Sequence, residues 1–290
     1  MTGYAERRWK SRDGLSLYAR DYAPAGDGDR LPVICLHGLT RNSADFEDLA
    51  PWLASLGRRV IVPDTRGRGR SDYDPQPMRY LPRTYARDVV EMMDALAVRR
   101  AIFLGTSMGG LIMMVLAASS GRRIAAAILN DVGPEIAPEG LARISAYAGK
   151  PVTIGDWADA RAYVKRNNAV AFPDFEDPDW DRLARRSFRE DESGKPVLDY
   201  DPHIADPIRA GKGKAPNWLA WFLFRRLARG RPALLVRGET SDILSRDIAR
   251  RMQARVPAMQ FAEVPGVGHA PGLDEPEARS AIERFLAPLP

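Results

Sequence analysis

The segment Gly105-Thr106-Ser107-Met108-Gly109 has the residue types and spacing of a serine nucleophile held in a tight turn. It follows the strand-like apolar run 101–104 and precedes the helix-like apolar run 111–118. Such a strand-to-helix turn strains the serine backbone and exposes its hydroxyl, while flanking glycines let neighbouring chain approach without a clashing Cβ atom. The N-terminus of the following helix favours nearby negative charge. We therefore predict that Ser107 is a nucleophile, against the alternative of a glycine-rich turn without catalysis.

A serine hydroxyl is a weak nucleophile and needs a base, for which the chain offers three histidines, His37, His203 and His269. His269 follows the strand-like run 259–264 and precedes a C-terminal helical pattern, so we expect it at the carboxyl edge of a sheet, the edge that also presents Ser107. His37 lies too close to the expected oxyanion loop, and His203 is expected to be structural or to line a pocket. His269 is therefore the predicted general base.

The base in turn needs a carboxylate that orients it. Asp242 follows the strand-like run 233–236 and gives the chain order Ser107, Asp242, His269, so we favour Asp242. Asp131 follows the run 125–129 at the same sheet edge and is the alternative acid; Glu239 is a more distant candidate.

Acyl transfer also needs two N–H donors for the oxyanion of the tetrahedral intermediate. The segment Leu36-His37-Gly38-Leu39-Thr40 follows the strand-like run 32–36 and can present the Leu39 amide. The residue after the nucleophile, Met108, supplies the second amide. The sequence therefore predicts an oxyanion hole made by Leu39 and Met108.

The elements that must position these residues alternate along the chain. An Asp13-Gly14 pair between two alternating runs predicts a β-hairpin. Strand-like and helical patterns then follow one another, which indicates a mostly parallel sheet covered by helices on both faces. The strand-like runs are 32–36, 59–63, 101–104, 125–129, 233–236 and 259–264, and the helical patterns include 45–56, 84–97, 111–118 and 275–286.

The alternation stops between positions 134 and 230, which show helical patterns, no convincing buried strand and four of the six tryptophans. An insertion after a strand end most simply makes a helical cap over the carboxyl edge of the sheet. We therefore divide the chain into a core of residues 1–133 and 231–290 and a helical cap of residues 134–230. The aromatic residues Trp218, Trp221, Phe222 and Phe224 are expected to pack against the core, with one or two lining the pocket.

Composition excludes several other classes. A chain of 290 residues with 45% hydrophobic and 28% charged residues suits one large globular domain with an insertion. The single cysteine, Cys35, excludes an internal disulfide and any multi-cysteine metal site. No apolar run follows Met1, so we expect no signal peptide. Asp177-x-Asp179-x-Asp181 lacks the glycine of a calcium loop, and the Gly-x-Gly segments lack the third glycine of a dinucleotide site. We expect a cytoplasmic protein without cofactor or metal.

The charge pattern argues against two kinds of partner. Of the 43 basic residues six are lysines, leaving 37 arginines, but acidic residues are interspersed and the net charge is only +5. We therefore expect no nucleic-acid partner and attribute the charge to solubility. Residues 101–121 carry no charge, yet the glycines in their middle indicate two short elements rather than a membrane span.

Taken together, these motifs resemble the α/β-hydrolase superfamily. The resemblance rests on Asp13-Gly14, His37-Gly38-Leu39-Thr40, the turn 64–72, the Ser107 segment, Asp242 and Gly268-His269. It implies an eight-stranded mostly parallel sheet flanked by helices, a helical cap inserted after the sixth strand, a Ser-His-Asp triad and no cofactor. The turn Asp64-Thr65-Arg66-Gly67-Arg68-Gly69-Arg70-Ser71 is similar to that of capped esterases, enol-lactonases and carbon–carbon bond hydrolases. The family often has Gly-x-x-Asp after the seventh strand, whereas Asp242 here comes one residue later, which keeps Asp131 open.

The expected function is hydrolysis of a small or medium carboxylic ester or lactone through an acyl-enzyme. Carbon–carbon bond hydrolysis of a vinylogous diketone with the same triad is an alternative. A second alternative is a catalytically silent receptor that binds a small molecule in the capped pocket.

Overall fold

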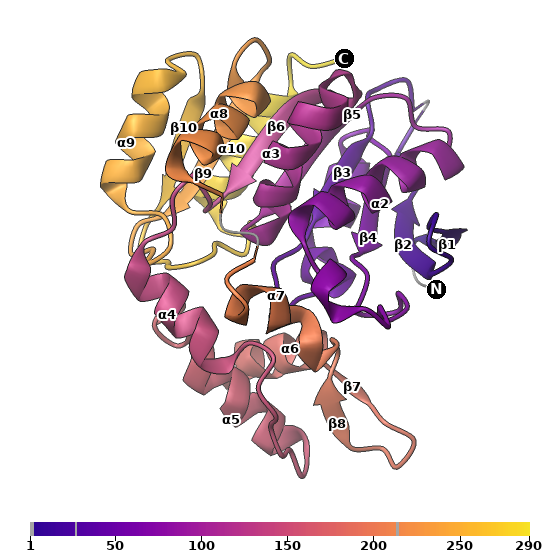
Figure 1. The fold of residues 1–290 in the computed structure, drawn as a ribbon. Coiled ribbons are helices and arrows are strands. Elements are labelled where there is room, and N and C mark those ends of the chain that lie inside the picture. Colours follow the sequence, from indigo (N-terminus) through magenta and orange to yellow (C-terminus); the bar gives the residue numbers. More distant parts are fainter. Residues whose placement is uncertain (1–2, 27, 213–214) are drawn as a thin grey trace.

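The computed structural model describes residues 3–26, 28–212 and 215–290. In these residues a single large sheet has eight strands in the order β1-β2-β4-β3-β5-β6-β9-β10. Strand β2 runs in the direction opposite to that of the other seven strands. The fold class predicted from the sequence, an eight-stranded mostly parallel sheet between helices, is confirmed (Figure 1). The strands are β1 (Ala5–Lys10), β2 (Ser16–Tyr22), β3 (Val33–Leu36), β4 (Val60–Asp64), β5 (Ala101–Thr106), β6 (Ile124–Asn130), β9 (Ala233–Gly238) and β10 (Gln260–Val264).

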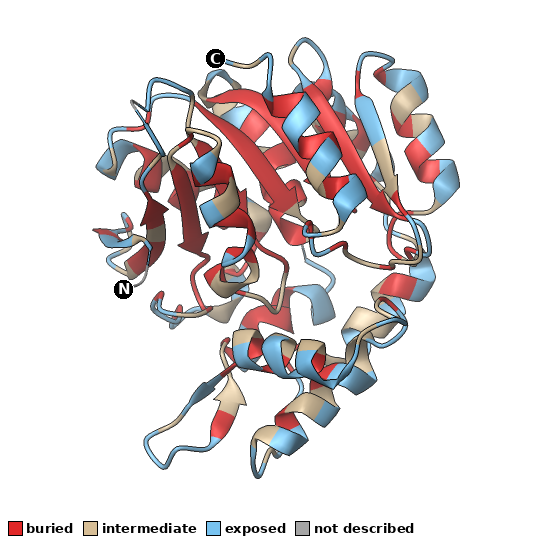
Figure 2. Ribbon diagram, turned by 180° about the vertical axis from the view of Figure 1, so that it is seen from behind, coloured by how far each residue is buried: buried red, intermediate tan, exposed pale blue. Residues whose placement is uncertain are grey.

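Helices cover both faces of the sheet, because the central strands carry apolar side chains on both faces and each face must be shielded from water. One hydrophobic core joins four helices to one face, and a second joins two helices to the other. Figure 2 shows the central strands buried beneath helices whose outer sides are exposed. The first face carries α2 (Pro82–Ala95), α3 (Met108–Ser120), α8 (Asn217–Ala228) and α9 (Arg246–Arg255); the second carries α1 (Leu49–Ser55) and α10 (Pro276–Leu286).

Two local predictions from the sequence are confirmed. The Asp13-Gly14 pair joins the antiparallel strands β1 and β2, and Gly14 adopts a φ of +91°, which glycine tolerates best. The uncharged stretch 101–121 divides into the buried strand β5 and the helix α3. Across the described ranges, every helix is too short or too polar to traverse a bilayer.

The segment after β6 lies beyond the carboxyl ends of the strands, at the bottom of Figure 1. It has a small hydrophobic cluster of its own around the buried Trp180 and Phe188. It also contains a short antiparallel hairpin, β7 with β8, that the sequence does not predict. The elements are α4 (Pro138–Tyr147), α5 (Trp157–Asn168), α6 (Asp177–Ser187), β7 (Phe188–Glu190), β8 (Pro196–Leu198) and α7 (Asp206–Arg209).

Helix α8 lies within the predicted cap of residues 134–230 but packs with the core of the sheet. It packs against α3, and its Trp221 and Phe224 are buried in the same core as the sheet residues. Trp218 and Phe222, on the outer side of α8, are 71% and 51% exposed. None of the four aromatic residues lines the pocket beside Ser107, so the expectation that one or two of them would do so is wrong. The reason is the spacing of the apolar residues, which gives α8 one face suited to the main core. The structure therefore places the last helix of the predicted cap in the layers around the sheet.

Candidate active site

Ser107 lies in a strained turn between β5 and α3. Its φ of +52° and ψ of −114° are unusual for a residue with a side chain. The absence of a Cβ atom at two neighbouring positions makes this turn feasible: a Cβ on Gly109 would collide with the Leu36 carbonyl, and one on Gly105 with the Gly109 backbone. The glycines predicted to flank the serine are therefore required by close backbone approach.

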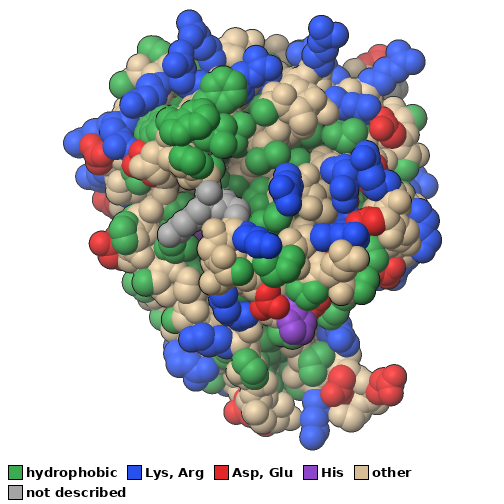
Figure 3. Space-filling model, viewed as in Figure 1, with side chains coloured by type: hydrophobic (Ala, Val, Ile, Leu, Met, Phe, Trp, Pro, Cys, Tyr) green, Lys and Arg blue, Asp and Glu red, His purple; other side chains and the backbone are tan. Residues whose placement is uncertain are grey.

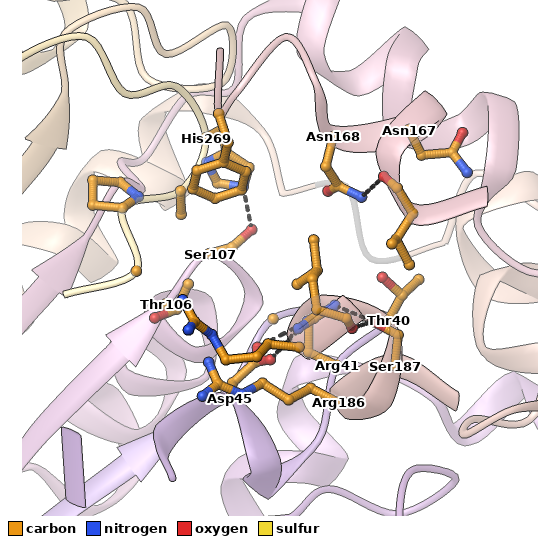
Figure 4. A pocket seen from close by; sticks show the side chains of 18 of the residues that line it. Thr40, Arg41, Asp45, Thr106, Ser107, Asn167, Asn168, Arg186, Ser187 and His269 are labelled. Carbon is orange, nitrogen blue, oxygen red and sulfur yellow. Dashed lines mark hydrogen bonds and ion pairs between the residues drawn. The ribbon is translucent and has the colours of Figure 1, made fainter. Parts of the chain in front are cut away.

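His269 links Ser107 to a buried carboxylate, and its hydrogen bond with Ser107 is drawn in Figure 4. The His269 Nε2 atom lies 2.9 Å from the Ser107 Oγ atom, and the His269 Nδ1 atom lies 2.8 Å from Asp131 Oδ2. An imidazole with Nδ1–H donated to a carboxylate presents its Nε2 lone pair to the hydroxyl. The arrangement is a hydrogen-bonded chain of hydroxyl, imidazole and carboxylate.

Asp131 is fully buried at the end of β6 and is held from the neighbouring strand β9. Its Oδ1 atom accepts a hydrogen bond of 3.1 Å from the Gly238 N–H, and its Oδ2 atom accepts one of 2.6 Å from the Ser241 hydroxyl. A buried ionised carboxylate needs such donors, since desolvation without them is costly. Ser241, whose part the sequence analysis missed, thus orients the carboxylate that contacts His269.

The favoured acid, Asp242, is placed elsewhere. Its carboxylate accepts hydrogen bonds from Arg143 Nε at 2.6 Å and Arg143 Nη2 at 2.8 Å, on helix α4. Partial burial raises the pKa of Asp242, but the hydrogen bonds and charge of Arg143, with a smaller effect from the charge of His269, outweigh it and hold that pKa below its usual value. Glu239 is also away from His269, since it accepts the Gly266 N–H. The structure thus corrects the preferred prediction: the carboxylate on His269 is the alternative, Asp131.

Leu39 lines the same pocket as Ser107, and Met108 directly follows Ser107 in the chain. Met108 is the first residue of α3, where the backbone N–H has no partner within the helix. The Leu39 backbone is fixed by Arg68, a fully buried side chain whose Nε donates to the Leu39 carbonyl at 3.0 Å. Arg68 Nη2 also reaches Met108 Sδ at 3.6 Å, so one guanidinium contacts both residues. The sequence analysis missed this contribution of Arg68.

The other two histidines have separate contacts. His37 is fully buried, with Nδ1 2.8 Å from the Gly38 carbonyl and Nε2 accepting the Thr65 N–H at 3.0 Å. Burial lowers the pKa of His37, which suits a neutral ring with one donating and one accepting nitrogen. His203 is exposed and contacts Asp206. Neither histidine contacts Ser107.

A pocket of about 200 Å³ opens between Ser107 and the helices beyond the sheet edge. His269 and Ser107 lie on one side of it, and Asn167 and Asn168 of α5 lie across from them (Figure 4). The arginines around it are paired, as with Arg143 and Asp242 or Arg186 and Glu47. In the part of the chain that the structure describes, no three His, Cys, Asp or Glu side chains gather as a metal site would require.

Comparison with known proteins places the chain in a family. The alpha/beta hydrolase fold family model matches residues 32–276. A curated relative, the 3-hydroxybutyrate-oligomer hydrolase of Cupriavidus necator, is 35% identical over 260 residues, covering 88% of this chain and 87% of that protein. Esterase YbfF of Escherichia coli is 28% identical, covering 94% of this chain and 99% of that protein.

A solved structure gives the same result. The crystal structure of an alpha/beta hydrolase from Novosphingobium aromaticivorans is similar with a TM-score of 0.92 and 46% identity, covering 99% of both chains. The chain therefore belongs to the α/β-hydrolase fold family and is a hydrolase.

Proposed function

We infer that the protein is a serine hydrolase that cleaves small carboxylic esters, with Ser107 as nucleophile, His269 as general base and acid, and Asp131 as the orienting carboxylate. The observation that supports this most directly is the hydrogen-bonded chain from Ser107 Oγ through both nitrogens of His269 to Asp131. Its geometry meets the requirement for a nucleophile within reach of a base that is itself held by a third group.

In the first half of the reaction, Ser107 Oγ attacks the carbonyl carbon of the ester while His269 Nε2 accepts the hydroxyl proton. The amides of Leu39 and Met108 stabilise the oxyanion, and the positive end of α3 adds to this. The intermediate expels the alcohol, which takes the proton from His269. In the second half, water attacks the acyl-enzyme, His269 accepts a proton from the water, and Ser107 regains it as the acid leaves.

The pocket favours a short acyl group. Its volume of about 200 Å³ is small, and its largely apolar walls also present polar side chains such as Thr40, Asn167 and Tyr147. The relative from Cupriavidus necator is named for hydrolysis of 3-hydroxybutyrate oligomers, which are esters with a free hydroxyl and a free carboxylate at their ends. We take short hydroxy-acid esters as the substrate class.

A substrate panel tests this assignment. We expect 3-hydroxybutyrate dimer and trimer and p-nitrophenyl acetate and butyrate to be hydrolysed, and p-nitrophenyl esters of long acyl chains to be poor substrates, because the pocket lacks room for them. The measurement is kcat/KM for each compound by acid release. A vinylogous diketone is included as a probe for carbon–carbon bond cleavage. Preferred turnover of the diketone, or of the long-chain esters, would contradict the proposal.

Ser241 gives a second test, since it acts on catalysis through Asp131. We expect Ser241→Ala to lower kcat about tenfold to a hundredfold with little change in KM, because a hydrogen bond to a charged group contributes about 1.5 to 3 kcal/mol and Ser241 does not line the pocket. Ser241→Thr keeps the hydroxyl and is the matched control. Equal losses in both variants would indicate a packing effect instead of a positioning role.

A further inference from the structure

A groove lined by arginines lies at the amino edge of the sheet, the edge opposite Ser107. Its volume is about 1100 Å³, and it is formed by the end of α3, the start of β6, the end of α8 and the residues before β5 and β9. In Figure 3, basic side chains gather along the top of the molecule, the end where α3 and α8 terminate in Figure 1. The catalytic proposal does not use any of these residues.

Seven arginines line this groove, which we call the arginine groove. Two, Arg122 and Arg123, come from the turn between α3 and β6, and three, Arg225, Arg226 and Arg229, from the end of α8. Arg100 and Arg231 precede β5 and β9. Convergence from four parts of the chain is unlike a charged face along one solvated helix.

The net positive charge of the protein is gathered at the arginine groove. Among the described residues its lining has no acidic side chain, and one of its arginines, Arg123, forms an ion pair, with Asp94. Seven positive charges less that one leave six, against +5 for the entire chain, so the remaining residues sum to −1. The negative ends of α3 and α8 offset only about one half-charge each.

Arg231 shows that this charge is not balanced within the protein. Its Nη1 atom is buried without a hydrogen-bond partner in the described residues. Burial and then the charges of Arg226 and Arg100 lower the pKa of Arg231. Arg231 is thus partly buried among like charges, and an anion bound in the groove would offset their repulsion.

We propose that the arginine groove is a binding site for an oligophosphate, a ligand with several phosphate groups in series. Tetrahedral phosphate oxygens accept hydrogen bonds from several directions, which suits guanidinium groups that converge from separate elements, whereas a planar carboxylate suits a single fork. The groove's volume lies just above the usual range for small-ligand sites, which leaves room for several phosphates. Phe222 also lines the groove, is half-exposed, and offers a face on which a nucleobase would stack.

The test is calorimetric titration of the full chain with tripolyphosphate and with ATP, the two sources of this chemistry. We expect micromolar binding that weakens with added salt, and at least a tenfold loss of affinity in the double variant Arg226→Gln/Arg229→Gln, because two charged contacts to phosphate are lost. If ATP binds more tightly than tripolyphosphate, and Phe222→Ala abolishes this difference, the ligand is a nucleotide. If the two bind equally, the ligand is an inorganic oligophosphate.

The matched control is Arg83→Gln/Arg250→Gln, which removes the same charge from exposed positions away from the groove. We expect it to bind like the parent protein, and circular dichroism checks that both double variants are folded. Equal losses in the two double variants would show nonspecific attraction and overturn the proposal. So would equal binding of a benzene tetracarboxylate, absence of binding at millimolar tripolyphosphate, or binding only to single-stranded RNA or to vesicles of anionic lipid.

Discussion

Ser107→Ala is expected to reduce kcat for ester hydrolysis by about a millionfold, the loss seen when a triad serine is removed. The substitution deletes the only atom that forms the acyl-enzyme, and the Leu39 and Met108 amides alone leave a small residual rate. Fold and stability should change little, because among the described residues the one side-chain hydrogen bond of Ser107 Oγ is with His269. The measurements are initial rates with p-nitrophenyl butyrate and thermal unfolding.

Labelling by a fluorophosphonate complements the rates. The parent protein should form a covalent adduct of one phosphonyl group, and Ser107→Ala and His269→Ala should form none. A protein that binds small molecules without catalysis would fail to react in its parent form. Retained turnover in a folded Ser107→Ala variant would sink the proposed mechanism.

The serine turn can be predicted from the sequence because local chemistry determines it. The positive φ of Ser107 and the approach of Gly109 to Leu36 need small residues at fixed positions, and those are visible as a spacing. His269 is identified by its place after the last strand and by the scarcity of histidines. The position of each of these two residues follows from the end of a single strand, so it can be predicted without knowing contacts between distant parts of the chain.

The acid cannot be chosen on the same basis, because two strand ends offer a carboxylate. The choice depends on how the loop after β9 turns, which is set by contacts made in the folded chain. Ser241 stands where the family's Gly-x-x-Asp pattern has its aspartate, counted from Gly238, and its hydroxyl points to Asp131. The carboxylate of the next residue, Asp242, instead accepts a hydrogen bond from Arg143, which is 99 residues away in sequence.

The place of helix α8 is hidden from the sequence for a related reason. Its aromatic residues indicate a buried face but not which core buries it, and the missing strand pattern before residue 231 suggests a cap throughout. In the structure, Phe224 and Leu227 are fully buried in the core of the sheet. Amphipathic spacing predicts that a helix has a buried face, but it does not say which other elements that face packs against.

Asp131→Asn is expected to lower kcat by about 10,000-fold, the effect of the equivalent change in a serine protease triad. The amide can donate to His269 Nδ1, which would leave the proton on Nε2 and so remove the lone pair that accepts the Ser107 proton. The neutral amide also gives no stabilisation to the imidazolium that forms during attack. KM should change less, because Asp131 does not line the pocket.

Asp242→Asn is the matched comparison, since it makes the same chemical change at the other candidate. We expect near-normal kcat, because its carboxylate contacts Arg143 and not His269. Rates measured for both variants with one ester decide the assignment: a large loss in Asp242→Asn with activity retained in Asp131→Asn would contradict it. A large loss in Asp131→Asn alone would mean that the acid follows β6, with Ser241 taking the position at which the family pattern has its aspartate.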